Sequence, residues 1–385
     1  MNQLPIDTKL KPIDSPFIVD TTLRDGEQCP GVVLSMDDKV ELLGSMLAIG
    51  IREFEIGIPA MGETACAEII ELEQAASRYG ARAICWARCH TDDVAACKRI
   101  KANAIHVALP VSDLQMKIIG MNRTEIIDRL NRVVRLARDS FSFVSVGAQD
   151  ATRADPRFLH RYIETASHLG VDRLRLADTV GCGNPLRTYQ LIAQLKERFF
   201  DLQLELHAHN DFGMATANAL AAIQAGADCV STTILGIGER AGNAPFESVV
   251  AASKEVLGVD FDVDTTAIYP LCRRVAQILD IEIPPSQPIV GRGVFSHESG
   301  IHTHGQLHHP KAFQPLLAEQ IGRAQPNFVF GTHSGRHAVK QLLRNANLPN
   351  DDEFTEKIVR QIKLVSRKEK AGLSEQEVVN IAMSQ

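Results

Sequence analysis

The chain has 385 residues, 45% of them hydrophobic, and a formal net charge of −6 at pH 7. A net negative charge argues against general attraction to nucleic acid or to an anionic membrane surface. Apolar runs fall well short of the ~18 residues of a membrane span, and the polar N-terminal segment has no signal-peptide core. Eight cysteines without a Cys-x-x-Cys pair favour reduced thiols. We therefore expect a cytoplasmic protein that binds neither nucleic acid nor membranes.

Short β-branched runs alternate with amphipathic helical stretches, eight times over, along the first two thirds of the chain. The predicted strands cover residues 17–20, 53–56, 82–86, 104–109, 143–146, 173–176, 203–207 and 229–233. The predicted helices cover residues 36–49, 64–79, 92–101, 123–139, 156–169, 185–199, 213–225 and 245–257.

Capping residues support these boundaries. Ser35, Asp155 and Asn184 each stand directly before a predicted first turn, where a side-chain oxygen can accept from a free backbone N–H group. Strict alternation of strand and helix predicts a parallel sheet, and eight units over about 250 residues predict a closed (β/α)8 TIM barrel. An open, doubly wound sheet is the alternative, but no Gly-x-Gly-x-x-Gly follows the first strand. Four glycines end the helices that they follow: Gly50, Gly80, Gly170 and Gly226.

The composition changes after the last of these units. Residues 283–288 are Pro-rich and predict a stiff extended linker, and residues 291–305 are rich in Gly and His. A final helical region follows. We therefore expect a barrel domain over 1–275, a linker with a His-rich lid over 276–330, and a mainly helical subdomain over 331–385.

Two polar segments follow predicted strands at opposite ends of the repeat. Asp20-Thr-Thr-Leu-Arg-Asp-Gly-Glu-Gln28 follows the first strand, and His207-Ala-His-Asn-Asp211 lies at the tip of the seventh. On a strand, side chains at i and i+2 share a face, so His207 and His209 can hold one ion together. Either motif alone is more often structural than functional. In a barrel both reach the same rim, where Asp25 would complete a set of two His and one carboxylate.

Such a cation could polarise a ketone and hold an adjacent carboxylate. Arg24 offers a fork of donors for developing oxyanion charge. The glycine-rich segment 236–243 follows the eighth strand, and Asn243 in it could add an oxygen ligand. An ordinary turn that closes the barrel is the alternative interpretation of this segment.

A cluster of histidines lies beyond the barrel. It could be a second metal-binding tract, or one of its members could transfer protons on a mobile lid. Its members are His297, His302, His304, His308 and His309.

These motifs together resemble the DRE-TIM metallolyases, within them the homocitrate synthase and 2-isopropylmalate synthase branch, and most of all the nitrogen-fixation type of homocitrate synthase. The match runs over nearly the whole chain. It rests on the segments 20–28, 207–211, 236–243, Ala177-Asp-Thr-Val-Gly181, Gly300-Ile-His-x-x-Gly305, Glu55-Ile-Gly-Ile-Pro-Ala-Met-Gly62 and Leu109-Pro-Val-Ser-Asp113.

The resemblance implies a Claisen condensation of acetyl-CoA with a 2-oxo acid, followed by thioester hydrolysis. It implies a divalent metal (Mn, Mg, Zn, Co or Fe) on Asp25, His207 and His209, with Asn243 close by. It also implies that Arg24 stabilises the developing oxyanion, that Glu205 relays protons or supports the site, and that His302 arrives from the neighbouring subunit of a homodimer. The residues expected to bind substrate are Gln28, Glu55, Arg88, His106, Gln149 and Thr179.

Three positions depart from the family pattern, and all three lose negative charge. Gln149 stands where a Glu is usual, and His304 where Asp usually follows the lid histidine. His106 stands where homocitrate-type relatives often have Asp and isopropylmalate-type relatives often have His. We expect 2-oxoglutarate as the acceptor, or another strongly anionic acid such as oxaloacetate or phosphonopyruvate. Neutral drift at positions that never touch substrate is the alternative, and it leaves 2-oxoisovalerate open.

Two other functions remain open. One is an acyl-CoA lyase that runs the retro reaction on the same rim, and the other is a metal-binding or scaffold protein that uses the His-rich tract. Because the chain ends soon after the lid region, we also expect no leucine feedback through a further regulatory domain.

Overall fold

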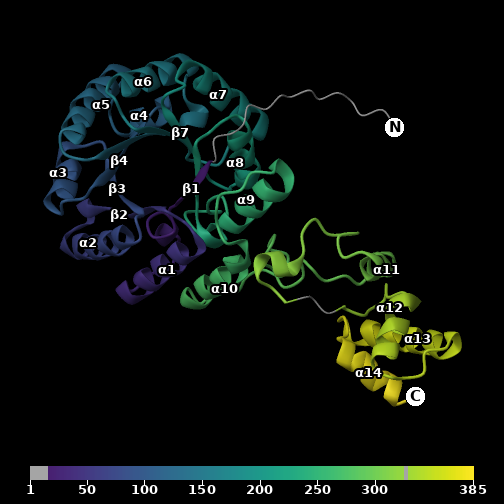
Figure 1. Ribbon diagram of the computed structural model, residues 1–385. Coiled ribbons are helices and arrows are strands. Elements are labelled where there is room, and N and C mark those ends of the chain that lie inside the picture. Colours follow the sequence, from purple (N-terminus) through teal and green to yellow (C-terminus); the bar gives the residue numbers. More distant parts are fainter. Residues whose placement is uncertain (1–15, 325–327) are drawn as a thin grey trace. The chain divides into compact units, whose positions relative to one another are not determined.

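The computed structural model describes residues 16–324 and 328–385, and eight parallel strands close its first part into a barrel in the order of the chain (Figure 1). The strand β1 pairs with β2 on one side and with β8 on the other. The predicted TIM barrel is confirmed. The strands are β1 (Phe17–Asp20), β2 (Glu53–Gly57), β3 (Arg82–Arg88), β4 (Ala104–Pro110), β5 (Phe143–Gln149), β6 (Arg173–Asp178), β7 (Gln203–Ala208) and β8 (Cys229–Thr232).

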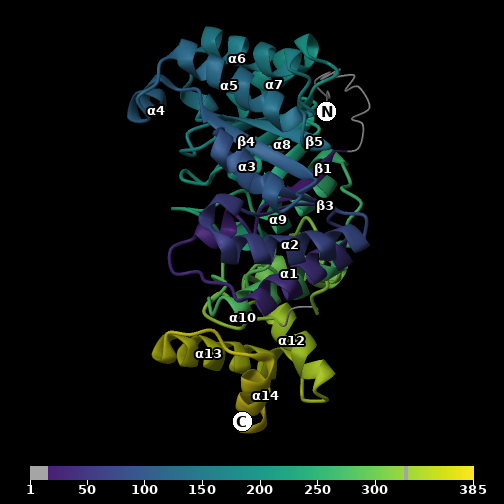
Figure 2. The ribbon, with the colours of Figure 1, turned by 90° about the vertical axis from the view of Figure 1, so that its left-hand side faces the viewer.

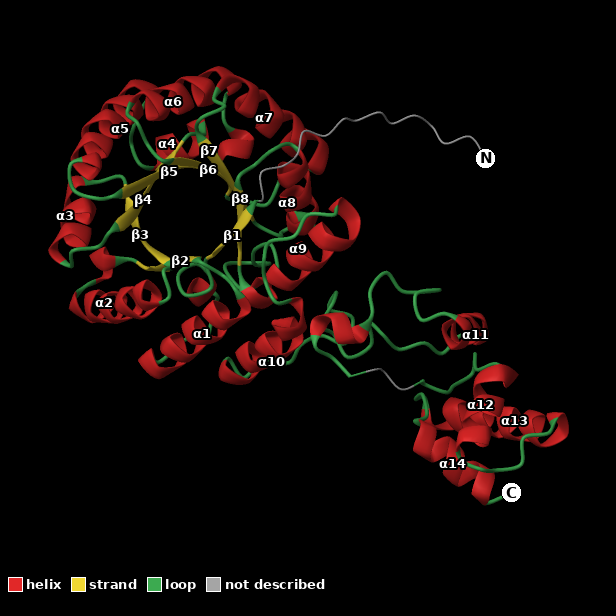
Figure 3. Ribbon diagram, in the orientation of Figure 1, coloured by secondary structure: helices red, strands yellow, loops and turns green. Residues whose placement is uncertain are grey.

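Helices form a ring outside the strands (Figure 3). Those of the barrel region are α1 (Met36–Ile49), α2 (Glu63–Arg78), α3 (Thr91–Arg99), α4 (Asp113–Ile118), α5 (Arg123–Arg138), α6 (Pro156–His168), α7 (Pro185–Arg198), α8 (Ala215–Gln224) and α9 (Phe246–Ala252). The later helices are α10 (Ile268–Ile278), α11 (Gly300–His308), α12 (Arg336–Asn345), α13 (Asp352–Glu369) and α14 (Glu375–Met383).

Helix boundaries follow the predicted caps. The side chains of Ser35, Asp155 and Asn184 each accept a hydrogen bond from the third backbone N–H of the helix that they precede. At Gly50 the backbone turns left-handed with φ 112°, and a Cβ there would lie 2.8 Å from the Asp262 carbonyl oxygen. Only glycine fits such a helix end.

Two features differ from the sequence prediction. The helix α4, with only six residues after its Ser112 cap, was missed because it is too short to show a helical period. The predicted helix 245–257 divides into α9 and a π-helical turn over Ser253–Leu257. Several strands also continue past their predicted ends, because polar residues such as Gln149 still pair with neighbouring strands at the barrel rim.

The chain divides into two compact units, residues 1–264 with 274–281, and residues 265–273 with 282–385. In the second unit α12, α13 and α14 pack around a core that includes Val339, Leu343 and Ile358 (Figure 2). The domain boundaries expected at 275 and 330 remain predictions. Residues 1–15 of the expected barrel domain and 325–327 of the expected lid region lie outside the described part. Within the described residues, no helix is both long and apolar enough to cross a membrane.

A charged side chain lies inside the barrel at the amino end of β6. Arg173, the first residue of β6, is fully buried and lies over the rings of Phe17 and Phe143. Its guanidinium nitrogens lie 2.8 Å from Glu53 Oε2 and 3.5 Å from Glu205 Oε2. Removing one partner of a buried ion pair leaves the other charge uncompensated, which is far more costly than losing a surface pair.

Arg173→Met is therefore expected to lower the free energy of unfolding by about 3–5 kcal/mol, because Glu53 and Glu205 keep their burial and lose a counter-charge. Chemical denaturation followed by circular dichroism measures this loss. The matched control is Arg138→Met, since Arg138 pairs with Asp172 at the surface and such pairs are worth about 1 kcal/mol or less. Equal losses in the two variants would contradict the prediction.

Candidate functional site

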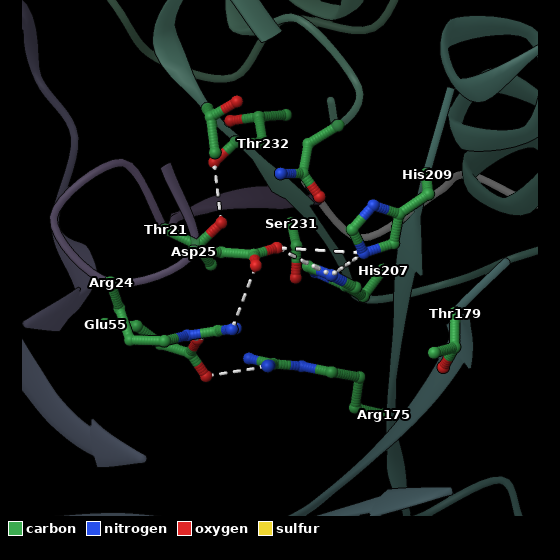
Figure 4. A network of polar contacts seen from close by, with 12 residues as sticks. Thr21, Arg24, Asp25, Glu55, Arg175, Thr179, His207, His209, Ser231 and Thr232 are labelled. Atoms are coloured by element: carbon green, nitrogen blue, oxygen red, sulfur yellow. Dashed lines mark hydrogen bonds and ion pairs between the residues drawn. The ribbon is translucent and has the colours of Figure 1, made fainter. Parts of the chain in front are cut away.

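Three predicted metal ligands meet at the carboxyl end of the barrel strands (Figure 4). His207 Nε2 lies 3.1 Å from Asp25 Oδ2, His209 Nε2 lies 3.8 Å from the same oxygen, and the two imidazole nitrogens are 3.3 Å apart. All three residues are buried. Among the described residues they form the group of His, Cys, Asp and Glu whose possible ligand atoms lie within 4.8 Å of one another.

Local structure fixes each of these ligands. His207 lies on β7 and His209 just past its end, so both side chains lie on one face of the strand. After β1 the chain makes a tight turn in which the backbone N–H groups of Arg24, Asp25 and Gly26 all donate to the Thr21 carbonyl. The Thr21 hydroxyl donates to the Thr232 carbonyl at the end of β8. The closing of the barrel therefore places Asp25 beside the two histidines.

The chemistry of these atoms fits a divalent cation. Asp25 Oδ2 is buried without a hydrogen-bond partner among the described residues. Burial raises the pKa of Asp25, but the Arg24 guanidinium and the two imidazoles outweigh it and hold that pKa well below its usual range. Burial and the neighbouring His207 lower the pKa of His209 to about 4. A carboxylate and a neutral imidazole are the forms in which these groups bind metal.

Asn243 lies at the edge of this group. Its Nδ2 donates to the Ile237 carbonyl at 3.1 Å, while its buried Oδ1 has no hydrogen-bond partner in the described part of the chain. A Cβ at Gly238 would lie 2.2 Å from Asn243 Nδ2. The glycine-rich segment 236–243 thus lets the backbone approach Asn243 closely, and it also pairs with the barrel end through the bridge between Asn243 and His209.

A cavity of about 270 Å³ opens beside the three ligands. Of the predicted site residues, those that line it are Arg24, Asp25, Gln28, His106, Gln149, Thr179, His207 and His209. Glu55 and Glu205 are fully buried and do not line it. Each of them instead binds an arginine that lines the cavity. Glu55 accepts from Arg24 Nε at 2.7 Å, and Glu205 accepts from Arg175 Nε at 2.7 Å.

Arg88 does not line this cavity, and His302 belongs to the second unit. The Arg88 side chain is 71% exposed and pairs with Asp93 at 2.8 Å. It lines a second cavity of about 660 Å³, which shares Trp86, Ala108 and Gln149 with the first. His302 lies on α11 in the second unit, where its ring stacks on Phe313 at 4.4 Å.

Several residues that line the cavity were not predicted as site residues, among them Arg175, Trp86 and Arg240. Arg240 pairs with Asp211 at 2.8 Å and donates to the Thr179 carbonyl, which holds the rim together. A signal for Arg175 was present, because charged residues recur at every second position of β2 (Glu53, Glu55) and β6 (Arg173, Arg175). That period places all four side chains on one face of their strands.

The comparisons with known proteins agree with this geometry. Residues 15–275 match the family model HMGL-like, and residues 289–370 match the model "Homocitrate synthase post-HMGL domain-like". Homocitrate synthase 1 of Nostoc sp. is 40% identical over 96% of this chain and 97% of its own length. Homocitrate synthase of Frankia alni is 42% identical over 84% and 92%. A probable 2-isopropylmalate synthase of Methanopyrus kandleri is 38% identical over 92% and 70%.

Solved structures show the same barrel. Hydroxymethylglutaryl-CoA lyase from Pseudomonas aeruginosa superposes with a TM-score of 0.62 over 70% of this chain and 95% of its own, at 21% identity. At that identity the likeness is one of fold.

His207→Ala should abolish tight binding of a divalent cation, because one of three protein ligands is lost. We expect the affinity for Mn²⁺ or Zn²⁺ to fall by about 100-fold or more, since even an outer partner of a ligand is worth 10- to 100-fold. Metal analysis after equilibrium dialysis measures this.

The control is His168→Ala, an exposed histidine at the end of α6. A chelator should lower the unfolding midpoint of the wild type and of His168→Ala but leave His207→Ala unchanged, because only a bound ligand adds stability. A chelator-sensitive midpoint in His207→Ala would argue against this cation site.

Proposed function

The chain belongs to the HMGL-like family, in the branch of the homocitrate and 2-isopropylmalate synthases, and we propose that it condenses acetyl-CoA with an anionic 2-oxo acid. In this reaction the acetyl methyl group loses a proton and its carbon bonds to C2 of the acceptor. Water then cleaves the thioester, so that CoA leaves as the thiol. The observation that carries the proposal is the convergence of Asp25, His207 and His209 beside a cavity lined by arginines.

The metal site would be formed by Asp25, His207 and His209, with Asn243 Oδ1 as a further oxygen. A divalent cation held there supplies Lewis acidity toward the 2-oxo group and orients the adjacent carboxylate. The metal itself stays open among Mn, Mg, Zn, Co and Fe, because mixed oxygen and nitrogen ligands suit several of them.

Arg24 stabilises negative charge on the reacting oxygen. Its guanidinium lines the cavity and lies 3.2 Å from Asp25 Oδ1 while Glu55 accepts from its Nε. A donor fixed in advance, where charge develops in the transition state, contributes more than one that must reorient. Thr179 and Gln28 line the same cavity and are assigned to hold the 2-oxo acid. Glu205 is assigned to position Arg175 rather than to transfer protons, since its carboxylate is occupied by Arg175 and Ser231.

The second cavity suits the arm of acetyl-CoA, which combines an apolar chain with anionic phosphates. Its lining includes the apolar residues Leu109, Ile118 and Ile119 and the cations Arg88 and Arg129. It shares Trp86, Ala108 and Gln149 with the cavity beside the metal ligands. We assign Arg88, predicted as a substrate-binding residue, to acetyl-CoA.

A lyase that runs the retro reaction is the second candidate. The match of residues 289–370 to the homocitrate synthase model favours synthesis. The two are separated by whether free CoA appears only when acetyl-CoA and a 2-oxo acid are both present.

Among 2-oxo acids, 2-oxoglutarate is expected to support the fastest release of CoA, because cationic side chains line the cavity. A thiol-trapping assay over a panel measures this, with oxaloacetate, phosphonopyruvate and 2-oxoisovalerate as the other members. Phosphonopyruvate as the best substrate would still agree with an anionic acceptor. A clear preference for 2-oxoisovalerate would refute it.

His302 is assigned to proton transfer at the active site of a neighbouring subunit in a homodimer. Mixing inactive Arg24→Lys with inactive His302→Ala, after partial denaturation and refolding, should then restore activity. Half of the dimers are mixed and each has one intact site, so we expect about a quarter of wild-type activity. If each subunit used its own His302, mixing would restore nothing.

A further inference from the structure

One buried nitrogen of the Arg175 guanidinium lacks a hydrogen-bond acceptor among the described residues. Arg175 on β6 lines the cavity, yet its side chain is almost fully buried. Its Nη1 lies 2.6 Å from Glu55 Oε1, and its Nε donates to Glu205 Oε1. Its Nη2 is buried and has no hydrogen-bond partner among the described residues. Buried polar groups are rarely left unpaired, and an unmet charged donor costs more than a neutral one.

The guanidinium cannot turn to satisfy this nitrogen. It is planar, and the two carboxylates on its other nitrogens fix the direction in which Nη2 points. Both carboxylates are themselves held, Glu55 by Arg24 and Glu205 by Ser231. The unpaired donor is therefore a fixed feature of the cavity wall.

An anion can approach this nitrogen without meeting uncompensated negative charge. Glu55 is shared between Arg175 and Arg24, and Glu205 is shared between Arg175 and Arg173. Each carboxylate next to Arg175 thus has a second guanidinium.

His106 on β4 lines the same cavity. Burial, together with the charge of Arg175, lowers the pKa of His106 well below its usual value, so the ring is neutral. Its Nδ1 makes a hydrogen bond with Ser145 Oγ at 2.9 Å. A Cβ at Gly147 would lie 2.6 Å from His106 Nε2, so the missing side chain on β5 leaves the space at this nitrogen open.

We propose that Arg175 Nη2 and His106 Nε2 form a subsite that receives the distal anionic group of the acceptor, a second carboxylate or a phosphonate. The inference rests on the proposed function. It adds to it the residue that selects dianionic over monoanionic acceptors. In this arrangement the 2-oxo group of the acceptor and the carboxylate beside it lie at the metal ligands. The distal anionic group of the acceptor then meets Arg175.

Arg175→Lys tests the subsite. Lysine keeps the positive charge for Glu55 and Glu205 but lacks the planar fork that presents Nη2. We expect the KM for 2-oxoglutarate to rise about 10- to 100-fold, the value of one charged hydrogen bond. The KM values for acetyl-CoA and for the monoanion 2-oxobutyrate should stay within about twofold, and so should metal content.

Gly147→Ala provides a second variant, because it obstructs His106 Nε2 and leaves every ion pair intact. It should weaken 2-oxoglutarate selectively in the same way, even if Arg175→Lys folds poorly. Calorimetric titration of the metal-loaded proteins with 2-oxoglutarate and with 2-oxobutyrate, without acetyl-CoA, gives a readout that does not depend on turnover.

The outcomes separate the two proposals. Equal weakening of both acids in the variants, or no preference for the dianion in wild-type binding, would overturn the Arg175 subsite. Wild-type protein that binds the dianion selectively but releases no CoA with any 2-oxo acid would overturn the condensing activity and leave the subsite standing.

Discussion

A line of alternating charges through the barrel is the constraint on which the site depends. Each member pairs with the next, from the lower end of the strands to the metal ligands, and every member is buried. Each of the three glutamates has two guanidinium partners, counting Arg82 for Glu53, and Asp25 has Arg24 beside the two imidazoles, so each buried carboxylate is compensated. The members in order are Glu53, Arg173, Glu205, Arg175, Glu55, Arg24 and Asp25.

The ion pairs of this line also position the polar groups at the cavity. Arg24 has two neighbours in it, Glu55 below and Asp25 above, and these fix its guanidinium at the cavity wall. The same contact keeps Asp25 ionised in spite of its burial. A barrel core made of hydrocarbon side chains would hold the strands together as well, but it would not set the direction of any donor. The charged core therefore orients groups as well as filling space, and the unpaired nitrogen of Arg175 is one result.

The sequence predicted the fold nearly strand by strand, because a repeated period of strand and helix is a local signal. It also predicted the meeting of Asp25, His207 and His209, since barrel topology places all strand ends on one rim. Arg175 was missed because the alternation of charged residues along β2 and β6 places its side chain on one face but does not give the partners that it meets across the barrel. Arg88 stays a prediction as a substrate-binding residue, and its side chain turns toward Asp93 and lines the second cavity. The role of His302 depends on assembly, which one chain's residues do not encode locally.

The pairing of β1 with β8 has a consequence for synthesis of the protein. Asp25 lies in the turn after the first strand of the barrel, whereas the histidines and Asn243 come from its last quarter. A growing polypeptide that has left the ribosome only as far as α7 contains Asp25 but neither His207 nor His209. A cation bound at the proposed site would therefore link the first part of the barrel to its last part, beside the pairing of β1 with β8.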